Sequence, residues 1–158
     1  MIRINTMHIP AGESLAVDGE EPGDFLELDP ENTPSQHGPV YYDLTASMAG
    51  RDLLVQGKVR AKLNAECARC LKQLRVNVEV PDVCHLYPGT AGQIVDISQD
   101  IREDVLLTIP VAFHCRKDCK GLCPSCGADL NEGPCSCGKK HKKKESSPWD
   151  ALDSLNFK

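Results

Sequence analysis

The stretch that decides the fold is residues 53–66, which read Leu-Leu-Val-Gln-Gly-Lys-Val-Arg-Ala-Lys-Leu-Asn-Ala-Glu. Apolar or small side chains stand at every second position from Leu53 to Ala65, and mostly polar side chains stand between them. A period of two is the pattern of a β-strand with one buried and one exposed face. The alternation resumes over residues 74–80, after Cys67-Ala-Arg-Cys70. The two segments therefore predict one antiparallel hairpin with a pair of cysteines at its tip.

Two further patterns flank this hairpin. Residues 40–48 alternate in the same way, and residues 49–52, Ala-Gly-Arg-Asp, predict a turn that joins them to the hairpin. After the hairpin the period changes from 2 to 3.6, because apolar residues recur every four positions at Ile97, Ile101, Val105 and Ile109. Acids lie in the first turns of this helix, and Pro110 ends it. We expect an α+β fold, mainly antiparallel β-sheet with one covering helix.

The composition along the chain predicts three parts. Residues 1–114 form the α+β domain, within which residues 11–39, rich in Gly, Pro and acids, are expected to be loop-rich. Residues 115–144 form a cysteine-rich zinc-binding module with a basic tail. Residues 145–158 form a short C-terminal helix, because Ser147-Pro148-Trp149-Asp150 supplies a cap, a proline at the first helical position and an early acid. We expect this helix to pack back on the domain through Trp149.

Length and composition exclude several classes. The chain has 158 residues, about one domain, and only seven aromatic residues, which argues against a large enzyme that stacks its ligand. No stretch approaches the roughly 18 apolar residues of a membrane span, and the first residues lack the apolar run of a secretory signal. These features predict a cytoplasmic protein with no membrane partner. In a reducing compartment, abundant cysteine indicates metal rather than disulfides.

The net charge of −5 hides a strong segregation. Residues 1–50 carry one base against nine acids, whereas residues 51–75 carry seven bases against two acids. Residues 76–114 are acidic again, and residues 115–144 carry eight bases against three acids. Eight of the nine cysteines lie in the two basic segments. An acidic protein therefore presents two local basic surfaces beside its cysteines, and these are candidates for nucleic-acid contact.

The cysteines carry the most specific signal. Tetrahedral zinc takes four soft ligands, and Cys-x2-Cys at a tight turn places two sulfurs on one ion. Cys123-Pro-Ser-Cys126-Gly127 is such a turn, because the glycine accepts the positive φ that the turn demands. Cys84 stands alone in an apolar setting and is expected in the core. The other eight supply one or two zinc ions: Cys67, Cys70, Cys115 and Cys119 for one site, and Cys123, Cys126, Cys135 and Cys137 for the other.

Sequence proximity alone leaves this partition open. Cys115 and Cys119 can instead join the cluster near the C-terminus, and His114 or His85 can replace a thiolate. A catalytic zinc keeps an open position and commonly has a histidine or carboxylate ligand, whereas here thiolates suffice to close every site. No deaminase signature, phosphate-binding loop or Ser/His/Asp set is present. The sequence therefore predicts no enzyme, no catalytic residues and no small-molecule substrate.

Several of these motifs together resemble a known family. They are Cys67-Ala-Arg-Cys-Leu71, the helix end Leu106-Leu-Thr-Ile-Pro110, the string Asp118-Cys-Lys-Gly-Leu-Cys-Pro-Ser-Cys-Gly127, Leu130-Asn131, Cys135-Ser-Cys137, and Pro148-Trp149 with Leu152. In these motifs the chain resembles the bacterial YceD family of large ribosomal RNA subunit accumulation proteins, from about residue 40 to 155. The resemblance implies a non-enzymatic ribosome biogenesis factor needed for accumulation of large-subunit (23S) ribosomal RNA. It implies precursor ribosomal RNA, a pre-ribosomal particle or early assembly proteins as partners.

Basic side chains allow a physical version of that role. Lys58, Arg60 and Lys62 project from one face of the predicted strand at intervals of about 7 Å, comparable to the phosphate spacing of an extended RNA strand. An ordinary solvated strand face is the alternative interpretation. The second candidate is a run whose bases are Lys139, Lys140, Lys142, Lys143 and Lys144. With so few aromatic residues, any RNA contact is expected to go through phosphates and shape rather than base stacking.

Two other function classes remain open at this point. The first is a protein adaptor that binds a basic ribosomal protein through the acidic first 50 residues. The second is a zinc-dependent transcription regulator, which needs a recognition helix with clustered bases. The predicted helix over residues 97–109 has one Arg and three acids, which counts against the second class.

Overall fold

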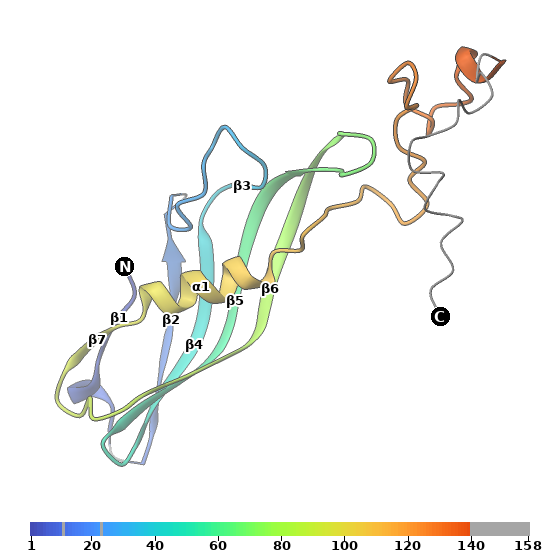
Figure 1. Cartoon of the computed structure of the whole chain (residues 1–158). Coiled ribbons are helices and arrows are strands. Elements are labelled where there is room, and N and C mark those ends of the chain that lie inside the picture. Colours follow the sequence, from blue (N-terminus) through green and yellow to red (C-terminus); the bar gives the residue numbers. More distant parts are fainter. Residues whose placement is uncertain (11, 23, 140–158) are drawn as a thin grey trace, which may run out of the picture.

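The computed structural model describes residues 1–10, 12–22 and 24–139 of the chain. One antiparallel sheet dominates the described part, and a single α-helix lies across it (Figure 1). The cysteine-rich segment stands beyond one end of the sheet (Figure 1). In chain order the elements are β1 (Arg3–Asn5), η1 (Thr6–His8), β2 (Ser14–Glu21), β3 (Ser35–Gln36), β4 (Val40–Ala49), β5 (Asp52–Glu66), β6 (Gln73–Tyr87), β7 (Ile94–Asp96), α1 (Ser98–Thr108) and η2 (Ser136–Lys139).

The β5–β6 hairpin is the centre of the sheet, as the alternation predicts. On its other edge β5 pairs with β4 and, near its C-terminal end, with β3, while β2 pairs with the outer edge of β4. The β4–β5 turn closes with Ala49 opposite Asp52, and Gly50 supplies the positive φ of 70°. The predicted turn and hairpin are thus confirmed, with Cys67 and Cys70 at the hairpin tip.

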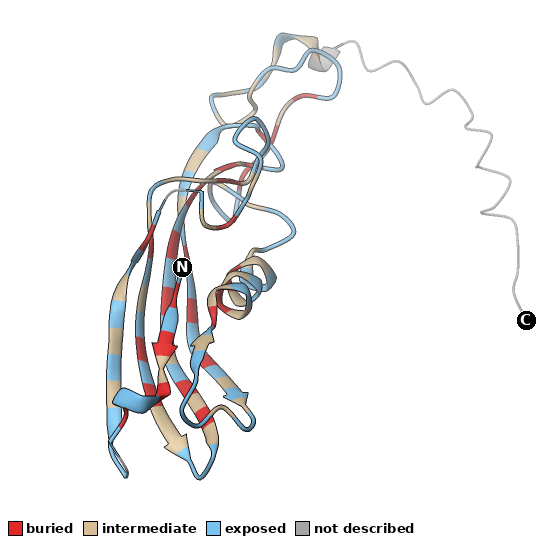
Figure 2. Cartoon of the chain, turned by 90° about the vertical axis from the view of Figure 1, so that its left-hand side faces the viewer, coloured by how far each residue is buried: buried red, intermediate tan, exposed pale blue. Residues whose placement is uncertain are grey.

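The helix α1 covers one face of the sheet. Figure 2 shows the sheet nearly edge-on, with α1 on one side and no described element on the other. Ile101 and Val105 of α1 are fully buried against the sheet, together with Ile97 just before it. From β4 and β5 the core receives Leu44, Leu53, Val55, Val59, Ala61 and Leu63. Burying a Val or Leu side chain contributes about 1.5–3 kcal/mol.

A short two-stranded ribbon sets the start of the helix. β1 pairs with β7, and Ile2 and Ile4 enter the core beside them. The Ser98 hydroxyl accepts a hydrogen bond from the backbone N–H of Ile2, at 2.7 Å, and Asp96 accepts one from the N–H of Ser98, at 3.0 Å. Together these contacts fix the chain just before the first turn of α1. In the described part of the chain, every helix is too short or too polar to cross a bilayer.

The structure differs from the sequence-based expectation over residues 11–39. Where composition predicts a loop-rich segment, residues 14–21 form β2 and residues 35–36 form β3. Leu15 and Val17 of β2 pack against the core while Asp18 and Glu20 face solvent. The acids that suggested a loop are therefore the exposed face of an edge strand, and β2 owes its conformation to pairing with β4 rather than to its own propensity.

A bulge in β6 overturns the placement of Cys84 in the core. Val59 pairs with Val80, but Gly57 pairs with Val83, so β6 carries one extra residue at this point. An inserted residue reverses the alternation, and Val83 is buried while Cys84 is exposed. The bulge also accommodates Pro81, which lets β6 continue to Tyr87 past the proline. The predicted helix over 145–158 lies outside the described residues, as do Lys140, Lys142, Lys143 and Lys144.

Candidate metal centres

The first Cys-x2-Cys turn is the tip of the β5–β6 hairpin. The Cys67 carbonyl accepts a hydrogen bond from the N–H of Leu71, and the Cys67 N–H donates to the carbonyl of Lys72, both at 2.9 Å. This closes a tight loop that holds Cys67 and Cys70 on one side. Leu71 occupies the position with positive φ, 58°, although it is not a glycine, and its side chain is 58% exposed.

The second Cys-x2-Cys turn repeats this pattern. The Cys123 carbonyl accepts from the N–H of Gly127, and the Cys123 N–H donates to the carbonyl of Ala128, both at 2.8 Å. Gly127, with φ 71°, stands where Leu71 stands in the first turn. The two turns are therefore equivalent loops, each of which presents two sulfurs to a common point.

Backbone pairing brings the segment after α1 to the hairpin tip. The N–H of Ala68 donates to the carbonyl of Phe113 at 2.8 Å, and residues 67 and 113 form an isolated parallel bridge. The Arg69 guanidinium donates to the carbonyl of Cys119 at 3.0 Å, while the Arg69 carbonyl accepts from the N–H of Leu122 at 3.1 Å. These contacts place Cys115 and Cys119 beside the hairpin cysteines.

Eight cysteines thus form two compact groups in the described part of the chain. We use "first cluster" for Cys67, Cys70, Cys115 and Cys119, and "second cluster" for Cys123, Cys126, Cys135 and Cys137. Within each cluster the four sulfurs lie within 4.8 Å of one another, so each cluster could hold a metal ion. This is the same division that sequence proximity suggests. Neither His85 nor His114 is a member of either group.

The sulfur spacing agrees with tetrahedral thiolate coordination. Four ligands at about 2.3 Å from one ion are about 3.8 Å apart. In the first cluster the Sγ atoms of Cys67 and Cys119 are 3.9 Å apart, and those of Cys70 and Cys115 are 3.7 Å apart. In the second cluster four sulfur pairs lie closer together, from 3.2 Å between Cys135 and Cys137 to 3.5 Å between Cys137 and Cys126. Two sulfur pairs of the first cluster therefore already have the spacing of a four-sulfur metal site, and the remaining pairs lie within 4.8 Å.

The electrostatics of the clusters favour a bound cation. The backbone N–H of Cys115 lowers the pKa of Cys67 to about 6, and the N–H of Ser125 lowers the pKa of Cys123 to about 6. In contrast, burial and then the neighbouring sulfurs raise the pKa of Cys115 to about 12. One thiolate in a cluster disfavours the next, because like charges repel at these distances. A metal ion between the sulfurs removes this conflict.

The three predicted basic side chains of β5 lie on the uncovered face of the sheet. Lys58, Arg60 and Lys62 are all exposed and form one row. Their cross-strand neighbours differ, since Lys58 lies opposite Asp43, Arg60 opposite Glu79, and Lys62 opposite Asn77. Directly opposite side chains are about 5 Å apart at Cβ. The acids therefore offset Lys58 and Arg60 in part, whereas no carboxylate lies directly opposite Lys62 on β6.

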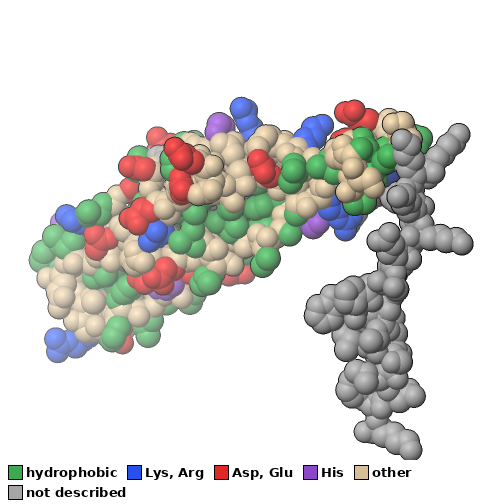
Figure 3. All heavy atoms as spheres, turned by 45° about the horizontal axis from the view of Figure 1, so that its top comes forward, with side chains coloured by type: hydrophobic (Ala, Val, Ile, Leu, Met, Phe, Trp, Pro, Cys, Tyr) green, Lys and Arg blue, Asp and Glu red, His purple; other side chains and the backbone are tan. Residues whose placement is uncertain are grey.

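Two residues take positions beside the clusters that the sequence did not indicate. Arg75, opposite Asn64, is exposed on the same face as Lys62 and adds a second base near the hairpin tip. The polar positions of the alternation over 73–79 could have indicated it. Asn131 donates a hydrogen bond to Cys119, at 3.4 Å between Nδ2 and Sγ. No local pattern indicates this contact. On the view in Figure 3, acidic and basic side chains are interspersed.

The chain matches the model of a known family. Residues 55–156, well over half of the chain, match the model of the family described as large ribosomal RNA subunit accumulation protein YceD. The matched range contains all eight clustered cysteines and the row on β5. No solved structure matches the chain.

Curated relatives are found in mycobacteria and plants. An uncharacterised protein of Mycobacterium tuberculosis is 30% identical over 154 residues, which cover 88% of this chain and 66% of that protein. One of Mycobacterium leprae is 32% identical over 126 residues, covering 70% and 56%. An Arabidopsis thaliana protein named large ribosomal RNA subunit accumulation protein YCED homolog 1, chloroplastic, is 44% identical over 58 residues, covering 37% and 18%. The chain thus spans less than two thirds of the length of each mycobacterial relative, 66% and 56% respectively.

Proposed function

The chain belongs to the YceD family of large ribosomal RNA subunit accumulation proteins, and from this membership we propose that it is a non-enzymatic factor for accumulation of large-subunit (23S) ribosomal RNA. It acts in the cytoplasm on precursor ribosomal RNA or an early pre-ribosomal particle. The observation that carries the proposal is the family match over residues 55–156, a range that includes both cysteine clusters.

Zinc is the metal we propose for the two clusters. Four thiolates at tetrahedral spacing suit zinc and leave no open coordination position for a substrate, so the metal is structural. Bound zinc holds the hairpin tip and residues 115–137 in one arrangement. The role of these residues is therefore to support a rigid end of the molecule rather than to perform chemistry.

RNA contact is proposed for the uncovered sheet face near that end. Lys58, Arg60 and Lys62 follow one strand, and Arg75 lies on the neighbouring strand. Such a row suits phosphate contacts, which do not require aromatic stacking. The run from Lys139 to Lys144 adds bases that would attract any polyanion. Because Asp43 and Glu79 lie opposite Lys58 and Arg60, we assign the larger contribution to Lys62.

A protein adaptor role is the second candidate. Pairing of β2 with β4 places Asp18 opposite Asp43 and Glu20 opposite Tyr41, on the same uncovered face. This grouping of acids would suit a basic ribosomal protein. A transcription regulator is less compatible with the fold, because α1 is held on the sheet. Its acids make contacts to β6, Asp104 with His85 at 2.7 Å and Asp100 with the Tyr87 hydroxyl at 2.5 Å.

Crosslinking in cells tests these assignments. Sequencing of the crosslinked RNA should recover large-subunit ribosomal RNA or its precursor, and depletion of the protein should lower that RNA relative to the small-subunit RNA. Recovery of a basic ribosomal protein without RNA would favour the adaptor. If crosslinking recovers neither RNA nor a ribosomal protein, both candidate functions are contradicted.

A charge variant sharpens the test on purified protein. Replacing Lys58, Arg60 and Lys62 together by Ala should weaken RNA binding and reduce the slope of log affinity against log salt by about 0.7–2.7, up to 0.9 per lost phosphate contact. Zinc content and thermal stability should stay unchanged. The matched control is Arg51→Ala, at the exposed β4–β5 turn at the opposite end of β5. An unchanged slope would make the row an ordinary solvated face.

A further inference from the structure

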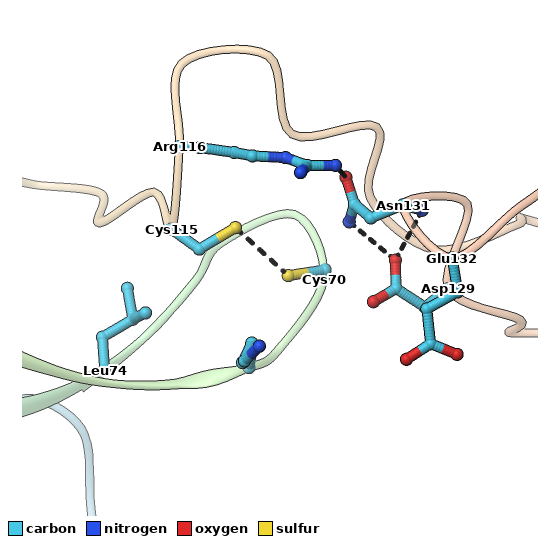
Figure 4. A pocket seen from close by; sticks show the side chains of 8 residues that line it. Cys70, Leu74, Cys115, Arg116, Asp129, Asn131 and Glu132 are labelled. Atoms are coloured by element: carbon cyan, nitrogen blue, oxygen red, sulfur yellow. Dashed lines mark hydrogen bonds between the residues drawn. The ribbon is translucent and has the colours of Figure 1, made fainter.

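Asn131 lies in the chain segment that carries the second cluster, but its side chain contacts a cysteine of the first cluster. It lies between Cys126 and Cys135, inside the loop that the second cluster closes. Its side chain, however, points toward the segment 115–120 of the first cluster (Figure 4). The amide nitrogen Nδ2 lies 3.4 Å from the Sγ atom of Cys119. Asn131 is therefore the contact through which the second loop reaches a sulfur of the first cluster.

Every polar atom of the Asn131 side chain is used. The oxygen Oδ1 accepts from the backbone N–H of Lys120 at 2.9 Å and from the Arg116 guanidinium at 2.8 Å. The nitrogen Nδ2 donates to the Asp129 carboxylate at 2.6 Å as well as to Cys119. Figure 4 shows Asn131 between Arg116 and Asp129, beside the cavity of about 430 Å³ that borders the first cluster. Such a set of partners fixes the orientation of the amide.

Backbone contacts hold the rest of this loop against the same segment. The N–H of Leu130 donates to the carbonyl of Gly121 at 2.9 Å, and residues 122 and 129 form an antiparallel bridge. Gly121 has φ 74°, and a side chain there would approach the carbonyl of Arg69 to 2.9 Å, so the three chain segments meet closely. The position of Asn131 thus depends on the fold of residues 123–137, which have little apolar material of their own.

We propose that Asn131 is a positioning residue for the first cluster, delivered by the loop of the second, so that metal binding at the second cluster raises metal affinity at the first. A hydrogen bond to a coordinating sulfur stabilises the thiolate and orients it toward the ion. Metal at the second cluster orders the loop and holds the Asn131 amide against Cys119. Coupling between binding sites is reciprocal, so metal at the first cluster raises affinity at the second by the same factor. The inference rests on the metal sites of the proposed function.

A thermodynamic cycle on the full chain tests the coupling, with zinc alone as the ligand. One variant, Cys126→Ser with Cys137→Ser, removes the second cluster. The other, Asn131→Asp, keeps the acceptor for Lys120 and Arg116 but removes the donor to Cys119 and to Asp129. Zinc affinity of the first cluster is measured by competition with a chromophoric chelator. Cobalt substitution reports the thiolate environment by its charge-transfer absorption. Asn77→Asp, on the exposed face of β6, adds the same charge as a control.

Asn131→Asp should weaken zinc at the first cluster about 10- to 100-fold when the second cluster is intact. Loss of the second cluster should weaken it to a similar degree. The two changes combined should lower the zinc affinity of the first cluster no further than either change alone, within about twofold. Equal affinity with and without the second cluster would overturn the coupling, as would an Asn131→Asp effect of equal size in both backgrounds. If neither the unmodified protein nor any of the variants binds zinc, the metal sites themselves are contradicted.

Discussion

The sheet and the cysteine-rich end are held together by different forces. The sheet with α1 has a continuous core of eighteen buried apolar residues. Around the first cluster, within the part of the chain that the structure describes, the buried group is Cys67, Cys70 and Cys119, with three partly buried neighbours. A segment with so little apolar surface cannot offset the entropy of ordering its chain. The comparison teaches that the sheet folds by hydrophobic burial, whereas residues 115–137 have little apolar surface to bury and depend on metal ligation only in the function proposed above.

Removal of metal should separate the two regions most clearly. The purified protein should hold about two zinc ions per chain, because eight thiolates form two four-sulfur clusters. Chelation should unfold residues 115–137, since binding free energy at such sites is folding free energy. Hydrogen exchange should show lost protection there and retained protection in β4, β5 and β6. Two results would contradict this difference between the sheet and the cysteine-rich end. One is that protein purified under reducing conditions contains no zinc, and the other is that chelation unfolds the sheet together with residues 115–137.

A substitution that leaves a cavity in the core should have the converse effect: it should destabilise the sheet and leave the zinc sites intact. Leu53 is fully buried in β5. Leu53→Ala should lower the free energy of unfolding of the sheet by about 2–5 kcal/mol, through lost burial and the cavity left behind. Zinc content should be unchanged. Leu86→Ala, at a position 57% exposed, is the matched control and should cost little. Equal losses for both variants in chemical denaturation would show that the assigned core is wrong.

Close backbone approach in the sheet predicts a smaller effect. At Gly57, φ is 152°, and a Cβ atom there would overlap the carbonyl oxygen of Asp43. Gly57→Ala should therefore destabilise the sheet by about 1–3 kcal/mol, through steric overlap with the Asp43 carbonyl together with strain at a positive φ. Gly89 also has positive φ, 67°, but a Cβ atom there would have nothing within 4 Å, so Gly89→Ala separates the contact from the conformation alone. If the two variants have similar unfolding midpoints, the contact with Asp43 is not the cause of the destabilisation.

The smallest expected effect compares the two equivalent cysteine turns. Leu71 adopts the positive φ that Gly127 adopts in the second turn. Leu71→Gly should stabilise the zinc-loaded first turn by up to about 1 kcal/mol by relieving the strain of a left-handed non-glycine residue. Gly127→Ala should have the opposite sign. Zinc dissociation rates from each cluster would check both. Faster release from the Leu71→Gly variant would show that the Leu71 side chain contributes more than its conformation costs.

Local repetition in the sequence determined much of this protein. The period of two defined the β5–β6 hairpin and its buried face, and the period of 3.6 defined α1, because both patterns arise from residues a few positions apart. Cys-x2-Cys spacing indicated tight turns for the same reason. These features are specified by neighbours along the chain, so one sequence suffices to recognise them.

Tertiary structure alone decided the rest. One extra residue in β6 turned Cys84 outward, and pairing with β4 made residues 14–21 an edge strand. Cross-strand register placed acids opposite Lys58 and Arg60. The fold of residues 123–137 brought Asn131 to Cys119. Each of these depends on which distant segments meet and in what register. Such contacts are selected by the free energy of the whole fold, so no local pattern encodes them.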